Sequence, residues 1–313
     1  MLLLLRRRSL RLSPSTGPSR RHLSSLPDLN IAALDRWVAS QSQKQLSMAT
    51  TISADHLRDL YSTLPTRDGS TRPFEQPKEG SSIAYGHHLA FFHPRNPERL
   101  LRADGTDADF CPSEPWTRRM AVAVAQIASV EKKGFGGGSP MVFVKQKIDY
   151  AREGSSEVCI AEERSHVYLA HLASRRAVKE VDVPKADFEF EYVPSPTTLF
   201  RFSALTFNGH YIHLDKDYAK SEGYLERLVH APLTALMMLE TAMFHIPEAA
   251  PKAFEYRAMN PIVVNSLIRL CGAREGQSSV RVWAEDENKV VGMTDLPANL
   301  SASSISCRFV CHT

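Results

Sequence analysis

The residues best suited to acid–base chemistry gather in one short stretch, TFNGHYIHLD. It contains Asn208, His210, His213 and Asp215. A histidine exchanges protons near neutral pH because its ordinary pKa is about 6.5. His213 could therefore serve a bound substrate as a general acid and base.

Two other interpretations of this stretch remain open from the residues alone. It could be a polar turn whose histidines satisfy local hydrogen bonds. It could also bind a metal through His210, His213 and Asp215. The metal interpretation is the weakest, because the two histidines lack the four-residue helical spacing that places both on one face. We expect no metal and no cofactor.

The elements around this stretch should position it before a buried helix. Residues 199–207 suit a strand, residues 208–215 a polar loop, and KDYAKSEG a short helix. Pro232 then opens the helix PLTALMMLETAMFH, because proline is tolerated in the first helical turn. This helix is apolar on almost all sides and should be buried. Three strand candidates follow it: AFEYRAMNPIVV, SLIRLCGA and SVRVWAED.

The first half of the chain contains further regular patterns. Residues 31–65 have helical spacing, whereas IAYGHHLAFF and residues 121–170 favour strands. In MVFVKQKIDY, one predicted face carries Val142, Val144, Ile148 and Tyr150. GFGGGSP leads into this strand, so it is a turn and not a phosphate-binding loop. Residues 66–82 form a polar connection.

The first 27 residues differ from the remainder in charge. They contain six Arg, several Ser and no Asp or Glu, which is typical of a mitochondrial transit peptide and predicts a matrix location. A disordered basic tail is the alternative. The remaining chain has more acidic than basic residues, which argues against nucleic-acid binding. No apolar run approaches the length of a membrane span, so we expect no stable membrane insertion.

A strand, one long buried helix and then several antiparallel strands describe a hot-dog fold. We predict an α+β protein of the double hot-dog type, in which two antiparallel sheets each wrap a long buried helix. The N-terminal half is degenerate, with PWTRRMAVAVAQ near the position of its helix. The predicted divisions are a transit peptide (1–27), an N-terminal half (28–174), a charged linker (175–196), a catalytic half (197–294) and an unassigned tail (295–313).

The block RFSALTFNGHYIHLDKDYAKSEGYLERLVHAPL resembles the signature region of the mitochondrial hydroxyacyl-thioester dehydratase type 2 family, within the MaoC-like hydratases and dehydratases. The resemblance covers roughly residues 30–294. It extends to GHHLAFFHP, DGTDADFCPSEPWTRRM, SPMVFVKQ, FEYRAMNPIVV and VRVWAEDENKVVGMT. It implies a (3R)-3-hydroxyacyl thioester substrate, carried by acyl carrier protein in type II fatty acid synthesis, and a dehydration that yields a trans-2-enoyl thioester.

The same resemblance assigns roles by position. His213 matches the family's catalytic histidine, and Asn208 falls where the wider MaoC group usually has an aspartate. Ala231 falls where a glycine offers its backbone N–H to the thioester oxygen. A helix N-terminus at this place would stabilise the charge that develops on that oxygen. Tyr211 and Leu214 stand where the family usually has an arginine and an aromatic residue.

The substrate carrier suggests a second group of candidates. Arg118, Arg119 and Arg201 could each hold a phosphate of phosphopantetheine or CoA, although surface arginines more often pair with a nearby carboxylate. Pro232 lies at the start of the buried helix and is a candidate substrate contact. The expected partners are acyl carrier protein or a CoA thioester. The fold also allows a homodimer, with a second copy of the chain as partner.

Two rival functions share the same fold. One is hydration of a CoA thioester, of the mesaconyl or itaconyl type, since hydration and dehydration are one equilibrium. The other is a non-catalytic hot-dog protein that binds acyl chains. The retained His213 argues against the binding protein, whereas Ala231 in place of glycine argues for it.

Overall fold

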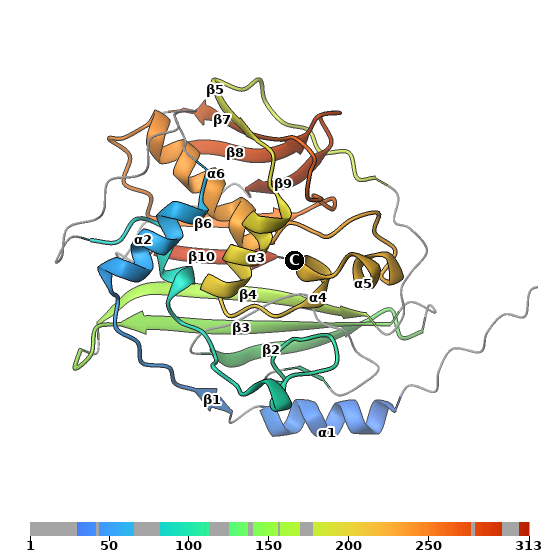
Figure 1. The fold of residues 1–313 in the computed structure, drawn as a ribbon. Helices are drawn as coiled ribbons and strands as arrows, with labels where there is room; N and C mark the ends of the chain where they lie inside the picture. The colour runs from blue at the N-terminus through green and yellow to red at the C-terminus, as the bar shows by residue number, and fades with distance from the viewer. Residues whose placement is uncertain are drawn as a thin grey trace, which may run out of the picture. The chain divides into compact units, whose positions relative to one another are not determined.

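The structure is a computed structural model, and its longest described helix, α6 (Ala231–His245), is buried as the sequence predicts. Its residues Leu233–Thr241 are all buried. Strands β5, β7, β8 and β9 pack against it (Figure 1). The described residues are 30–41, 44–65, 82–109, 111–112, 125–136, 140–155, 157–169, 178–276, 279–295 and 307–312.

Five antiparallel strands wrap this helix. They are β5 (Phe188–Tyr192), β6 (Ala253–Ala258), β7 (Ile268–Glu275), β8 (Ser279–Asp286) and β9 (Val291–Asp295), in the spatial order β6-β9-β8-β7-β5. The three strands predicted after the helix are confirmed. A strand, a long buried helix and antiparallel strands around it form the expected hot-dog arrangement.

The strand that precedes the helix was misplaced by the sequence analysis. Residues 199–207 do not form a strand, because Pro196–Leu205 forms helix α3. The hydroxyl of Ser195 accepts from the N–H of Thr198, whose hydroxyl accepts from the N–H of Ser195, a capping box that starts a helix. The actual strand is β5, which lies inside the segment 175–196 that we interpreted as a linker.

The first half contains a second antiparallel sheet. The predicted meander is confirmed as β2 (Ala125–Lys133), β3 (Met141–Ala151) and β4 (Val158–Leu169), and β1 (Gln45–Leu46) pairs with β2. The predicted inward face of β3 is also confirmed, since Val142, Val144, Ile148 and Tyr150 are buried. Most of PWTRRMAVAVAQ lies outside the described residues, and its last two residues begin β2.

The helices of the first half follow the predicted pattern only in part. Residues 31–65 contain α1 (Ile31–Gln41) and α2 (Ala54–Thr63), with β1 between them. The strand predicted for IAYGHHLAFF is wrong: a 3-10 helix, η1 (His87–Ala90), follows Gly86, whose positive φ of 82° turns the chain. A second one, η2 (Glu98–Leu100), follows. Of the predicted connection 66–82, residues 66–81 lie outside the described part.

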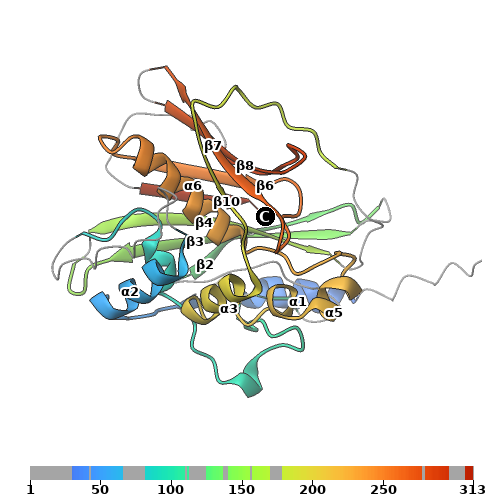
Figure 2. The ribbon, with the colours of Figure 1, turned by 45° about the horizontal axis from the view of Figure 1, so that its top comes forward.

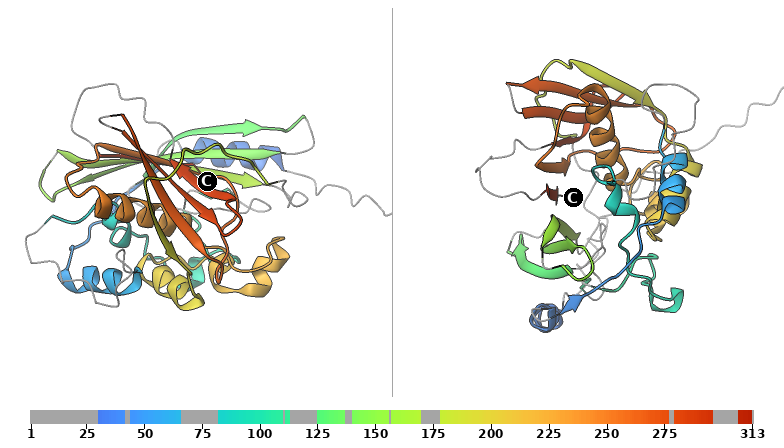
Figure 3. Two further views of the ribbon diagram at one scale, coloured as in Figure 1. Left: turned by 90° about the horizontal axis from the view of Figure 1, so that it is seen from above. Right: turned by 90° about the vertical axis from the view of Figure 1, so that its left-hand side faces the viewer.

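One strand from the predicted unassigned tail joins the two sheets. β10 (Cys307–His312) runs parallel to β4 on one side and to β6 on the other (Figure 2). The result is one ten-stranded sheet in the order β1-β2-β3-β4-β10-β6-β9-β8-β7-β5. Helices α2, α3 and α6 lie on the same side of it (Figure 3). Among the described residues, no helix combines the length and apolarity needed to cross a bilayer.

Candidate active site

The predicted polar loop 208–215 contains a short helix, α4 (Tyr211–Leu214). The short helix predicted for KDYAKSEG is confirmed as α5 (Lys216–Ser221). The chain leaves α3 through Phe207, whose φ of 50° reverses its direction. The N–H of Asn208 then donates to the carbonyl of Ser203, 2.9 Å away. This turn folds residues 208–214 back against the helix, so the loop is fixed at its start.

His213 lies on α4 and is only 5% exposed. Its Nδ1 lies 2.8 Å from the carbonyl oxygen of Leu228. A carbonyl can only accept, so Nδ1 must carry the proton in this contact, and the Nε2 of a neutral ring holds the lone pair. The N–H of Leu228 donates in turn to the carbonyl of Ile212. Leu228 therefore holds the ring of His213 and the backbone of the residue before it.

A second histidine, His230, stacks on the first. The two ring centroids are 3.8 Å apart and the planes differ by 21°. His230 is fully buried, and its Nε2 lies 2.9 Å from Oγ of Ser203. Burial lowers the pKa of His230 well below its ordinary value, and any positive charge on His213 or His210 lowers it further. His230 is therefore a neutral ring near pH 7.

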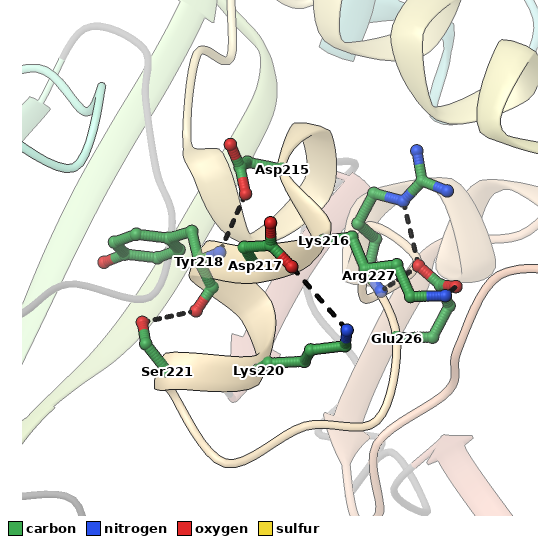
Figure 4. A network of polar contacts seen from close by, with 8 residues as sticks. All are labelled: Asp215, Lys216, Asp217, Tyr218, Lys220, Ser221, Glu226 and Arg227. Carbon is green, nitrogen blue, oxygen red and sulfur yellow. Dashed lines mark hydrogen bonds and ion pairs between the residues drawn. The ribbon is translucent and has the colours of Figure 1, made fainter.

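Of the polar residues that the sequence singled out, three come together and one does not. His210 is buried, with its ring centroid 5.8 Å from that of His213. Asn208 lies beside it, because its Oδ1 accepts from the N–H of His210. Asp215 is exposed and caps α5 by accepting from the N–H of Tyr218 (Figure 4). Among the described residues, no group of three His, Cys, Asp or Glu could hold a metal ion.

The N-terminus of α6 lies next to the stacked histidines, because His230 is the residue that precedes the helix. Ala231 and Pro232 follow it and are half-buried. The first N–H groups of a helix have no carbonyl one turn earlier, and they carry the positive end of the helix dipole. The backbone N–H of Ala231 is thus a donor that can stabilise an oxyanion close to His213.

A surface network anchors the segment that holds His213. Glu226 accepts from Lys216 of α5 at 2.6 Å, and also from the backbone and side chain of Arg227, each at 3.0 Å (Figure 4). The hydrogen bond from Lys216 is the main reason that the pKa of Glu226 falls to about 2. These contacts tie α5 to the chain just before Leu228.

The first half of the chain supports the same loop from the other side. The N–H of Tyr211 donates to the carbonyl of Asp104 at 3.0 Å. Gly105 and Gly209 approach each other so closely that a Cβ on either would meet the carbonyl oxygen of the other. The Asp104 carboxylate accepts from both the N–H and the hydroxyl of Thr106, which fixes the turn.

The predicted phosphate-binding arginines are not brought to this site by the described contacts. Arg118 and Arg119 lie outside the described residues. Arg201 is exposed on α3 and donates to the carbonyl of Ser62, at the end of α2. For Arg201 the structure therefore shows a link between two helices.

Sequence reasoning missed the residues that hold the histidine in place. His230, Ser203 and Leu228 were not singled out, because each acts through a contact between segments that are separate in the sequence. One signal was available: in LVHAPL, a histidine directly precedes the proline-containing first turn of the buried helix. Its ring must therefore lie at the helix N-terminus.

Comparison of this chain with known proteins shows which family it belongs to. A family model described as hydroxyacyl-thioester dehydratase type 2 matches residues 121–264. Mesaconyl-C(4)-CoA hydratase of Chloroflexus aurantiacus is 30% identical over 264 residues, which cover 77% of this chain and 89% of that protein. The mitochondrial hydroxyacyl-thioester dehydratase type 2 of Schizosaccharomyces pombe is 34% identical over 243 residues, which cover 63% of this chain and 79% of that one. The chain belongs to the hydroxyacyl-thioester dehydratase type 2 family.

Membership of the hydroxyacyl-thioester dehydratase type 2 family places the chain among the hydro-lyases that act on acyl thioesters. Among solved structures, HtdX of Mycobacterium tuberculosis is similar over 80% of this chain and 98% of its own, with a TM-score of 0.48 and 14% identity. A MaoC-like dehydratase from Phytophthora capsici covers 55% of this chain and 62% of its own, with a TM-score of 0.40 and 16% identity.

Proposed function

We propose that this protein dehydrates (3R)-3-hydroxyacyl thioesters on acyl carrier protein to trans-2-enoyl thioesters, in mitochondrial type II fatty acid synthesis. The observation that carries the proposal is the hydrogen bond from His213 Nδ1 to the Leu228 carbonyl. It leaves Nε2 as the basic nitrogen of a buried ring beside a helix N-terminus. A base and an oxyanion donor are what removal of a proton next to a thioester requires.

In the proposed reaction, Nε2 of His213 takes the proton from the carbon next to the thioester carbonyl. The negative charge moves to the carbonyl oxygen, where the N–H of Ala231 and the positive end of α6 stabilise it. A carbon–carbon double bond then forms as the β-carbon–oxygen bond breaks. His213 returns the proton to the departing hydroxyl, which leaves as water. No oxidant or reductant is involved.

Asn208 has a supporting role in this proposal. An amide cannot act as a general acid near pH 7, so the proton transfer falls to His213. The Oδ1 of Asn208 accepts from the N–H of His210, which fixes the side chain and presents its amide nitrogen as a donor. That nitrogen would hold the β-hydroxyl oxygen. Pro232 would line the site, and Arg118 and Arg119 would hold a phosphate of the carrier.

A CoA thioester is the second candidate substrate, and one observation favours it. The relative that matches 77% of this chain is named a mesaconyl-C(4)-CoA hydratase. The mitochondrial relative from Schizosaccharomyces pombe and the Arg-rich first 27 residues favour the carrier-protein reaction in the matrix. Both reactions would use the same base and the same helix N-terminus.

The proposal is tested by assaying the purified full-length chain with (3R)-3-hydroxyacyl thioesters on carrier protein and on CoA, in both directions. We expect His213→Ala to lower kcat at least about 100-fold, the scale expected for loss of a general base. The control is His245→Ala, an exposed histidine at the other end of α6, which should retain activity. A folded wild-type protein that turns over neither thioester would overturn the catalytic proposal and favour acyl binding without turnover.

A further inference from the structure

His230 is a buried titratable residue to which the proposed reaction gives no role. Its ring has no exposed surface and lies flat against the ring of His213, with centroids 3.8 Å apart. Of the buried histidines in the part of the chain that the structure describes, His230 is the one whose ring stacks on that of His213, whereas His210 meets it edge-on. The question is what a second imidazole does at that distance.

Helix α3 fixes the ring of His230. Phe202 meets it edge-on, with centroids 5.1 Å apart and an interplanar angle of 62°. Ser203, the next residue of the helix, places Oγ 2.9 Å from Nε2 of His230. Phe202 and Ser203 are themselves 1% and 5% exposed. Two neighbouring side chains of one helix thus hold the imidazole in a single orientation.

The stacking contact with His230 fixes the plane of the His213 ring, which a single hydrogen bond does not. The bond from Nδ1 of His213 to the Leu228 carbonyl fixes one atom of that ring and allows the ring to tilt about it. The stacked ring fixes the plane. We propose that His230 is a positioning residue, and this inference rests on the proposed function of His213. The flat, neutral ring of His230 is held by α3, and its stacking fixes the ring of His213 so that Nε2 of His213 points at the substrate.

The charges around the stack agree with this role. The titratable groups that act on His230 are His213 and His210, and burial is the larger cause that keeps its pKa low. Two imidazolium ions could not share a separation of 3.8 Å in a buried site. The proton taken from substrate therefore stays on His213, where the face of a neutral aromatic ring favours a cation. His230 itself carries no proton between substrate and solvent.

The test compares two substitutions of one residue. His230→Ala removes the stacked ring, and His230→Phe keeps a flat aromatic ring without nitrogen atoms. We expect His230→Ala to lower kcat about 10- to 100-fold with KM within about threefold of wild type, since a displacement of the order of 1 Å can cost that much. We expect His230→Phe to recover kcat to within about fivefold of wild type.

Folding is checked by near-UV circular dichroism and Tm, with His166→Ala as the matched control. His166 is 1% exposed on β4, so its loss should lower Tm and leave kcat unchanged. If His230→Ala does not fold, Ser203→Ala replaces it and should lower kcat by a smaller factor with KM unchanged. The inference is overturned if the folded alanine variant keeps wild-type kcat, or if the phenylalanine variant is as slow as the alanine variant.

The two proposals fail in different ways. If His213→Ala keeps its activity, the proposed base is wrong whatever His230 does. If His213→Ala is inactive and His230→Ala is as fast as wild type, the base stands and the positioning role falls. Side-chain ¹⁵N spectra give a readout without turnover: in His230→Ala, the His213 nitrogen signals should broaden or average, and in His230→Phe they should not.

Discussion

Glu226 shows how one surface carboxylate can support a buried histidine. Its two oxygens accept from Lys216 of α5 and from Arg227, which lies directly before Leu228. The pKa of Glu226 falls to about 2, chiefly because of the hydrogen bond from Lys216. The folded protein therefore holds this carboxyl ionised at a pH where the unfolded chain protonates it.

We predict a defined pH window for this contribution. Because the folded-state pKa of about 2 lies below the ordinary value of 4.5, the contact stabilises the fold fully above about pH 4.5 and loses its effect as the pH falls toward 2. Glu226→Gln should lower Tm at pH 7, and its difference from wild type should shrink below pH 4.5. Thermal unfolding followed by circular dichroism across this range measures it. A difference that stays constant with pH would mean that the carboxylate charge contributes nothing.

His213 could be proposed as the base from the sequence, because its residue type and its family position agree. The partners that orient it could not, since the Leu228 carbonyl is a backbone group and has no residue-type signal. The tautomer of His213, on which the mechanism depends, follows only from that spatial contact.

The turn around Gly105 is the element that the first half contributes to the site. Gly105 has a φ of 78°, and a Cβ there would overlap the carbonyl oxygen of Gly209. Gly209 lies between Asn208 and His210, so any shift of its backbone moves both. The close contact with Gly105 therefore fixes the backbone position of the loop 208–214, which carries His210 and His213.

Gly105→Ala should lower activity much more than a comparable glycine substitution elsewhere. The matched control is Gly154→Ala in the turn between β3 and β4, where φ is 76° but no atom lies within 4 Å of an added Cβ. Both variants lose about 1–2 kcal/mol of stability from the left-handed backbone. We expect kcat to fall at least about tenfold for Gly105→Ala alone, because only there must the histidine loop move. Equal kcat values for the two folded variants would show that the glycine contact does not position the loop.

Two elements show why part of the fold was misassigned from sequence. Residues 199–207 looked like a strand because their apolar residues are dense, yet Leu199, Phe202 and Leu205 are three apart and form the buried face of α3. β5 was interpreted as linker because charges and prolines surround it. Its alternation, FEFEY, is that of a strand, and its place at the edge of the sheet requires only one buried face. The helix α6 was predicted correctly, because a helix that is apolar on almost all sides is stable only when it is buried.

Across the whole molecule, a buried pair connects the first half to the central helix. Nε2 of His87 in η1 lies 2.8 Å from the carboxylate of Glu240 in α6. The two residues are 0% and 3% exposed. Next to it, Nε2 of His88 lies 3.7 Å from Glu162, which also pairs with Arg164. An acidic residue in the middle of an otherwise apolar stretch of α6 thus pairs with a residue of the other half.

Removing one member of this pair should destabilise the protein strongly. We expect His87→Ala to lower the free energy of unfolding by about 3–5 kcal/mol, because the substitution removes one member of a fully buried hydrogen-bonded pair. The control is Lys147→Ala, which breaks an exposed ion pair with Asp149 and should cost less than about 1 kcal/mol. Urea unfolding measured by circular dichroism compares them. A loss below 1 kcal/mol for His87→Ala would show that water or another group takes over the partner's role.

Strand β10 has a consequence for how fast the native state can form. Each antiparallel sheet is built mainly from strands that are neighbours in sequence, and such contacts close short loops. β10 is different, because Cys307 pairs with Ile160 and Arg308 pairs with Ala253. The chain must lose the entropy of closing these long loops before the hydrogen bonds of β10 can form and offset that loss. The two sheets should therefore form first and merge last, which makes the insertion of one short parallel strand the slow kinetic phase of refolding.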